Sequence, residues 1–99
     1  MFKMETVDDL WNHIAYVMAY GPDRFPHEDF LEERDQMTLD MAFAHLRRGV
    51  EIAYPEESYV SRRDELNDIL DESYQSYKDG ADIPAARLLK KFEKEIFRA

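Results

Sequence analysis

The sequence predicts an all-α protein, either a four-helix bundle or a compact four-helix array, that forms one domain over residues 1–99. Apolar residues recur at spacings of three and four in four separate stretches, which is the pattern of amphipathic helices. Glycine and proline separate those stretches at Gly21, Pro22, Pro26, Pro55 and Gly80. Hydrophobic residues make up 44% of the chain, which is too many for a disordered protein even at a net charge of -9.

The first helix is predicted from Val7 to Tyr20. Thr6 precedes it and is suited to be the N-cap, because a threonine hydroxyl accepts a hydrogen bond from a backbone N–H of the first turn. Gly21 follows the last turn, where glycine commonly ends a helix. The side predicted to be buried carries Leu10, Ile14, Val17 and Met18, with Trp11 at its edge.

The second helix is predicted to begin between Pro26 and Glu28 and to extend to Tyr54, just before Pro55. This length exceeds the usual ~8–20 residues, so a break near Asp35 or Gly49 is left open. Gly49 has two interpretations: it allows a neighbouring helix to approach closely, or it ends the helix. The predicted buried seam consists of Leu39, Ala42, Phe43, Leu46, Val50 and Ala53.

A second apolar side is predicted on the same helix. At about 100° per residue, Phe30, Met37 and Met41 project nearly opposite the buried seam. A helix that is apolar on two sides is either central in its fold or presents one side to a partner. If the second interpretation is correct, these three residues form the two-fold interface of a homodimer.

The third helix is predicted to begin at Glu57 or Ser61 and to end at Asp79, with Gly80 directly after it. Its predicted core side consists of Tyr59, Leu66, Ile69, Leu70 and Tyr77. The short connection that follows predicts an antiparallel pair with the last helix.

The fourth helix is predicted to start after Asp82 as its N-cap, with Pro84 in the first turn, where the missing N–H is harmless. One side of it is apolar and consists of Ala85, Leu88, Leu89, Phe92 and Ile96. Another side is basic and consists of Arg87, Lys90, Lys91 and Lys94.

Carboxylates are concentrated on the third helix. Asp64, Glu65, Asp68, Asp71 and Glu72 fall on one side of it, and we call this set the acidic stripe. It is either a solvated surface, partly neutralised by the basic side of the fourth helix, or a surface for a cationic partner. Tyrosine is a common anchor in protein interfaces. The candidate partner-binding residues are therefore Glu57, Asp64, Glu65, Asp68, Asp71, Glu72 and Tyr74.

Motifs for catalysis and for cofactors are not found in the sequence. No paired Glu-x-x-His pattern, glycine-rich phosphate loop or nucleophile elbow occurs, so we expect no enzyme, no cofactor and no metal site. His13, His27 and His45 are interpreted as surface or edge residues. The negative charge disfavours nucleic acid as a partner, and no apolar run approaches the ~20 residues of a membrane span. Without a leader sequence, we expect the protein to be cytoplasmic.

The closing stretch carries a family resemblance. Residues 76–80, SYKDG, and residues 85–93, AARLLKKFE, are similar in style to the final helix pair of small, acidic, helical bacterial immunity proteins. These are the antidotes made beside colicin-type or contact-dependent growth-inhibition toxins. The resemblance implies a protein-binding inhibitor that covers the cationic surface of a basic nuclease toxin. The alternative is a non-catalytic, homo-oligomeric structural or regulatory module, and the chain is expected to be a monomer or homodimer.

Overall fold

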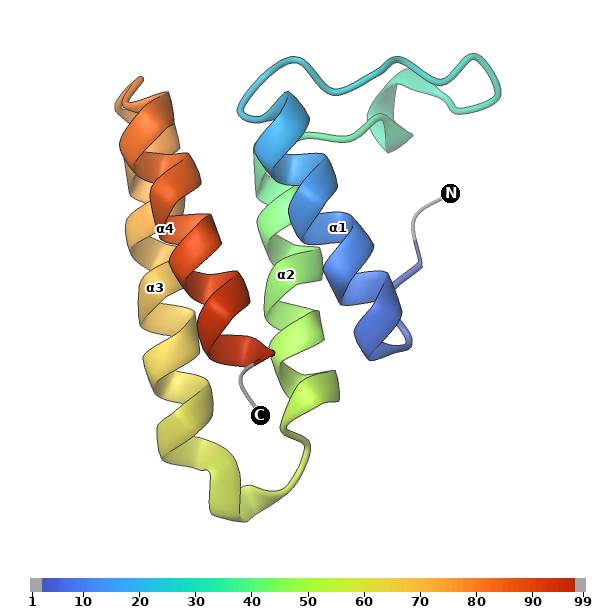
Figure 1. The fold of residues 1–99 in the computed structure, drawn as a ribbon. Coiled ribbons are helices and arrows are strands. Elements are labelled where there is room, and N and C mark those ends of the chain that lie inside the picture. Colours follow the sequence, from blue (N-terminus) through green and yellow to red (C-terminus); the bar gives the residue numbers. More distant parts are fainter. Residues whose placement is uncertain (1–2, 98–99) are drawn as a thin grey trace.

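The described part of the chain folds into four α-helices, which confirms the all-α prediction (Figure 1). The computed structural model describes residues 3–97. Two short 3-10 turns, Glu33–Asp35 and Glu57–Tyr59, precede the second and third helices. The helices are α1 (Val7–Tyr20), α2 (Leu39–Ala53), α3 (Val60–Lys78) and α4 (Asp82–Ile96).

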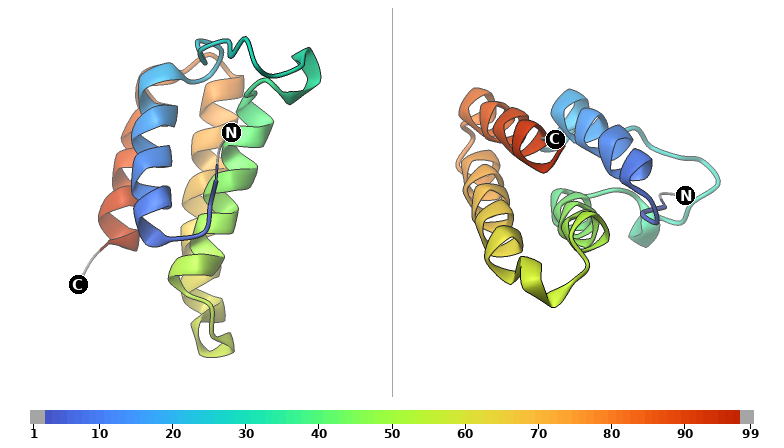
Figure 2. Two further views of the ribbon diagram at one scale, coloured as in Figure 1. Left: turned by 90° about the vertical axis from the view of Figure 1, so that its right-hand side faces the viewer. Right: turned by 60° about the horizontal axis from the view of Figure 1, so that its bottom comes forward.

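The helices run alternately up and down, so that each is antiparallel to the next (Figure 1). α2 packs on α1 and on α3, α4 packs on α3, and α1 closes the array against α4 (Figure 2). The segment between α1 and α2 is different, because it extends as a long loop beyond one end of the helices. Each helix therefore has two helical neighbours and retains an outward side.

The core is made by the apolar sides that the sequence predicts. Its fully buried members come from all four helices: Leu10, Ile14, Val17, Ala42, Phe43, Leu46, Val50, Leu66, Leu70, Ala85, Leu89 and Phe92. Tyr59 is a correction, because it is 42% exposed instead of buried. It lies in the 3-10 turn before α3, where its ring packs edge-on against Tyr54 at 5.3 Å. A 3-10 turn has about three residues per turn, so Tyr59 does not continue the α-helical spacing of Leu66 and Leu70.

α1 has the predicted bounds and the predicted N-cap. The Asp9 N–H donates to Thr6 Oγ1 at 3.1 Å, and the Thr6 N–H donates to Asp9 Oδ2 at 3.1 Å. This reciprocal capping box satisfies two of the backbone donors that a helix start leaves unpaired. Gly21 directly follows the last residue, as predicted.

α2 begins at Leu39, so the predicted start between Pro26 and Glu28 is wrong. Thr38 is the N-cap, and its hydroxyl accepts from the Met41 N–H at 3.2 Å. The helix continues through Gly49. A Cβ atom there would lie 2.4 Å from Leu10 Cδ1, so the glycine allows α1 and α2 to approach closely.

The last two helices differ from prediction at their starts, and α3 ends at Lys78, one residue before the predicted Asp79. Of the two predicted starts of α3, Ser61 is one residue from the observed start and Glu57 is wrong. α3 begins at Val60, and the residues from Glu57 to Tyr59 form the 3-10 turn instead of helix. Gly80 has φ of 80°, the left-handed conformation that glycine adopts at helix ends. Ala81, not Asp82, occupies the N-cap position of α4. Asp82 lies in the first turn, where the helix dipole stabilises a negative charge.

Candidate protein-interaction surface

The acidic stripe lies on the outward side of α3. All five carboxylates are exposed, while Leu66, Leu70 and Tyr77 on the opposite side are buried. Asp68 occupies the centre, because Asp64, Glu65, Asp71 and Glu72 stand three or four residues from it in either direction. Residues at those spacings are neighbours on a helix surface, so each flanking carboxylate repels Asp68.

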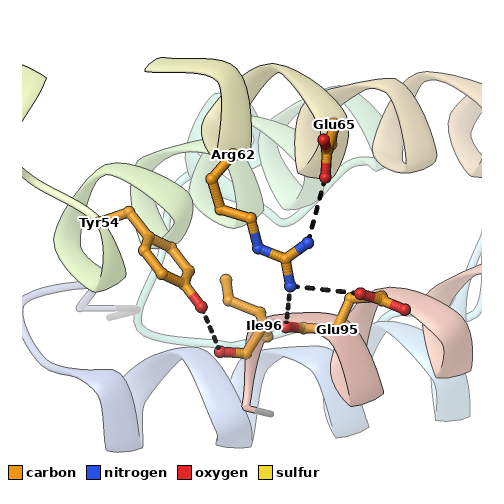
Figure 3. Close-up of polar contacts among 5 residues, drawn as sticks. All are labelled: Tyr54, Arg62, Glu65, Glu95 and Ile96. Atoms are coloured by element: carbon orange, nitrogen blue, oxygen red, sulfur yellow. Dashed lines mark hydrogen bonds and ion pairs between the residues drawn. The ribbon is translucent and has the colours of Figure 1, made fainter. Parts of the chain in front are cut away.

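Two arginines pair with carboxylates of the acidic stripe, Glu65 towards one end and Asp71 towards the other. Arg62 reaches from α3 to α4, with Nη1 at 3.2 Å from Glu65 Oε2 and Nη2 at 3.2 Å from Glu95 Oε2 (Figure 3). At the other end, Arg47 of α2 pairs with Asp71 through Nη1 and Oδ1 at 2.6 Å. The stripe carboxylates in these pairs are exposed, and exposed pairs contribute about 0–1 kcal/mol each, so they orient side chains more than they stabilise the fold.

The other three carboxylates of the acidic stripe have no such pairing. Asp64, Asp68 and Glu72 make no ion pair within residues 3–97. Asp68 and Glu72 line a groove of about 360 Å³ between α3 and α4. The basic side of α4 contributes Lys91 to this groove, which leaves the groove predominantly acidic. The groove residues are Arg62, Glu65, Asp68, Ile69, Glu72, Lys91 and Glu95.

Tyr74 borders the acidic stripe but faces α2. Its hydroxyl donates to Asp40 Oδ1, and its ring packs edge-on against Phe43 at 5.4 Å. The hydrogen bond to Asp40 raises the pKa of Tyr74 above its ordinary value. Lys78 Nζ lies 5.5 Å from the centre of the same ring. The Tyr74 side chain therefore already packs between α2 and α3. Glu57, by contrast, is exposed in the turn before α3.

The three residues predicted as a second interface do not share a helix face. Phe30 lies in the loop before α2 and is 70% exposed. Met37 also lies in that loop, where it is half-buried against the core. Met41 is in the first turn of α2 and is half-buried.

Several polar contacts that organise this region were not predicted. Arg63 donates to the carbonyl oxygens of Tyr54 at 2.6 Å and Glu56 at 2.7 Å, which fixes the connection between α2 and α3. Ser73 is fully buried, and its hydroxyl donates to the Ala85 carbonyl at 2.9 Å where α3 meets α4. The spacing from Leu66 and Leu70 places Ser73 on the core side, and that signal was available in the sequence.

The histidine interpretation is wrong for His13. This residue is 4% exposed, and its Nε2 lies 3.0 Å from the Ala42 carbonyl oxygen. Burial lowers the pKa of His13 from 6.5 to about 4, so the ring is neutral at pH 7. His45 lies against it with ring centres 5.3 Å apart. Among residues 3–97, no group of three or more histidines, aspartates and glutamates could hold a metal ion.

Comparison with known proteins finds no matching family model, no similar curated protein and no similar solved structure. The resemblance to immunity proteins therefore stays a prediction. In the part of the chain that the structure describes, no helix is long and apolar enough to cross a membrane.

Proposed function

We propose that this protein is a protein-binding inhibitor, and specifically an immunity protein that neutralises a basic nuclease-type toxin by covering its cationic surface. The observation that supports this is that three of the five carboxylates in the acidic stripe are unpaired. Asp64, Asp68 and Glu72 are exposed and make no ion pair within residues 3–97, and they do not contribute to the core. The fold gains nothing evident from their charge.

The position of the stripe suits recognition of a cationic surface. α3 is the longest helix at 19 residues, so its carboxylates project from a rigid element with defined spacing. Arg47 holds Asp71 and Arg62 holds Glu65, which lowers the entropy that a partner would have to remove on binding. A row of anions with this geometry resembles a phosphate backbone in charge, and a nuclease cleft is built to bind such a backbone. Electrostatic attraction would also accelerate the encounter.

A single substitution tests the proposal. Asp68→Lys reverses the central charge, and Asp35→Lys is a matched control with the same change in net charge in the loop before α2. Asp71 is less suitable, because reversal there would also break its pair with Arg47. The partner is first captured from the native host at about 10 mM salt, where the Debye length is about 30 Å, and then purified.

We expect the Asp68→Lys protein to associate with the purified partner at least tenfold more slowly than the wild type at low salt, because steering by complementary charge changes association rates by about 10–1,000-fold. The Asp35→Lys protein should resemble the wild type. The difference should vanish near 1 M salt, where the Debye length is about 3 Å. Stopped-flow fluorescence measures the rates, and nuclease assays measure inhibition. Equal rates for both variants would refute the stripe as the contact surface.

A further inference from the structure

A second groove lies at the end of the array where α1 finishes and α4 begins, and its charge is opposite to that of the acidic stripe. It has a volume of about 380 Å³. Ile83 at its edge is 69% exposed, which is unusual for a large aliphatic side chain. Its apolar lining comes from Met18, Gly21, Tyr77, Ile83 and Ala86, and its charged rim from Arg24, Asp82, Arg87 and Lys90. We call it the α1–α4 groove.

The rim of the α1–α4 groove has an excess of positive charge. Neither Arg24 nor Arg87 makes an ion pair among residues 3–97, and Lys90 pairs only with Glu93, at 2.8 Å. Tyr77 adds no charge, because burial raises its pKa to about 12. A suitable occupant would insert an apolar side chain and place carboxylates beside the arginines.

One segment of this chain has that composition. Phe30 is 70% exposed, and Asp29, Glu32 and Glu33 beside it are exposed carboxylates. We call residues 28–33 the Phe30 loop. Each of these three carboxylates has a partner that flanks the loop: His27 lies near Asp29 and Glu33, and Arg34 pairs with Glu32. Residues 28–33 contain four acidic residues and no basic one, so the loop keeps an excess of negative charge.

The Phe30 loop is held in a defined shape by one side chain. Gln36 Oε1 accepts from the Glu28 N–H at 2.9 Å, and Gln36 Nε2 donates to the carbonyl oxygens of Glu28 and Leu31, each at 2.9 Å. These hydrogen bonds close the backbone on both sides of Phe30. An exposed aromatic ring on a preorganised loop binds at a lower entropic cost than one on a flexible segment.

Within one chain the Phe30 loop does not fill the α1–α4 groove. Phe30 is not among the groove residues, and the loop extends away from α4, past the α1 and α2 side of the array (Figures 1 and 2). We propose that the Phe30 loop of one copy docks into the α1–α4 groove of a second copy, with the Phe30 ring on the apolar lining and the loop carboxylates beside Arg24 and Arg87. The contact is heterologous, because it joins two different surfaces.

Self-association through this contact should be weak. The contact involves one loop and one groove, and each copy carries a net charge of -9, so the two chains repel each other overall. We expect a dissociation constant between about 1 µM and about 1 mM, the range of small, transient interfaces. The contact uses none of the acidic stripe, so it stands or falls independently of the inhibitor function.

Two one-sided variants test the contact by sedimentation equilibrium. Phe30→Ser removes the anchor and keeps the groove, whereas Arg87→Glu reverses the rim and keeps the loop. Both side chains are exposed, so both variants should fold. Val60→Ser is a matched control, because Val60 is 47% exposed and lies outside both surfaces.

The wild type and the Val60→Ser protein should show a mass that rises with concentration, and each one-sided variant should associate at least tenfold more weakly. An equimolar mixture of the two variants should recover association, because the intact loop of one meets the intact groove of the other. If the wild type stays monomeric up to about 1 mM, the proposal is overturned. The occupant of the groove would then be an acidic segment of another protein. A mixture that associates no better than its separate components overturns it as well.

Discussion

Protonation of His13 should destabilise the protein as the pH falls from neutral to mildly acidic. The ring is buried between α1 and α2, and its Nε2 donates to the Ala42 carbonyl, which can only accept. Burial lowers the pKa of His13 to about 4, an effect that the hydrogen bond to Ala42 opposes and that the nearby His45 reinforces. In the unfolded chain the same residue titrates near its ordinary value of 6.5.

The sign and size of the effect follow from these two values. Because the unfolded state binds the proton more readily, the stabilisation is fully present above pH 6.5 and is lost as the pH falls towards 4. At about 1.4 kcal/mol per pH unit, the whole difference corresponds to roughly 3 kcal/mol. About 2 kcal/mol of this should be lost between pH 7 and pH 5. Most carboxylates titrate below that window, so it isolates the histidine.

Urea unfolding at pH 7 and pH 5 measures this loss. His13→Gln keeps a side-chain N–H for Ala42 but does not titrate, so its free energy of unfolding should change much less between the two pH values. His27→Gln is the matched control, because the His27 side chain is 60% exposed, and it should lose as much stability as the wild type. An equal loss in the His13→Gln protein would refute the assignment of the pH dependence to His13.

Two substitutions test the packing of the helices by the same urea assay. Gly49→Ala should destabilise the protein by about 1–3 kcal/mol despite the better helix propensity of alanine, because its Cβ atom would lie 2.4 Å from Leu10 Cδ1. Leu10→Ala in the Gly49→Ala background should cost less than Leu10→Ala alone, and additive losses would contradict the clash. Ser73→Ala should cost about 1 kcal/mol, because it removes the 2.9 Å hydrogen bond from Ser73 to Ala85. Unchanged stability would show that this bond does not help to join α3 and α4.

Helix ends were predictable where the signal is local. Thr6 and Gly21 flank α1 and define it to the residue, because the cap uses only the backbone and Asp9 within the same turn. Gly80 is similar, since its φ of 80° depends on the lack of a side chain. These signals need no knowledge of the packed structure.

The start of α2 could not be found in the same way, because two start signals compete. Pro26 is compatible with a first helical turn, and Thr38 is compatible with an N-cap. The Gln36 side chain decides between them. It forms hydrogen bonds with the backbone of Glu28 and Leu31, which holds this segment as a loop instead of a helix. The Phe30 side chain is also exposed outside the core, so a helix at this position would gain no stability from burying it.

The acidic stripe was predictable as an exposed face, because its residues lie on the side of one helix opposite to the apolar residues. The intramolecular ion pairs of its carboxylates were not predictable. Arg62 and Glu95 are 33 residues apart in the sequence, and Arg47 and Asp71 lie on different helices, so both pairs depend on how the helices pack. The hydrogen bond from Tyr74 to Asp40 likewise depends on how α2 and α3 pack. The sequence predicted which carboxylates face outward, and the structure distinguishes the two that are paired from the three that are not.

Asp68 provides a test of whether the acidic stripe is a binding surface or a merely solvated one. A surface that only confers solubility mixes both charge signs, yet Asp68 has carboxylates three and four residues away on both sides. Each like-charged pair at this spacing costs about 0.2–0.5 kcal/mol, so Asp68→Lys should stabilise the free protein by on the order of 1 kcal/mol at low salt, although Lys91 in the same groove offsets part of this. The same substitution should weaken inhibition. A residue that costs stability and supports binding is typical of a functional site, whereas a solvated surface would show the gain in stability without the loss.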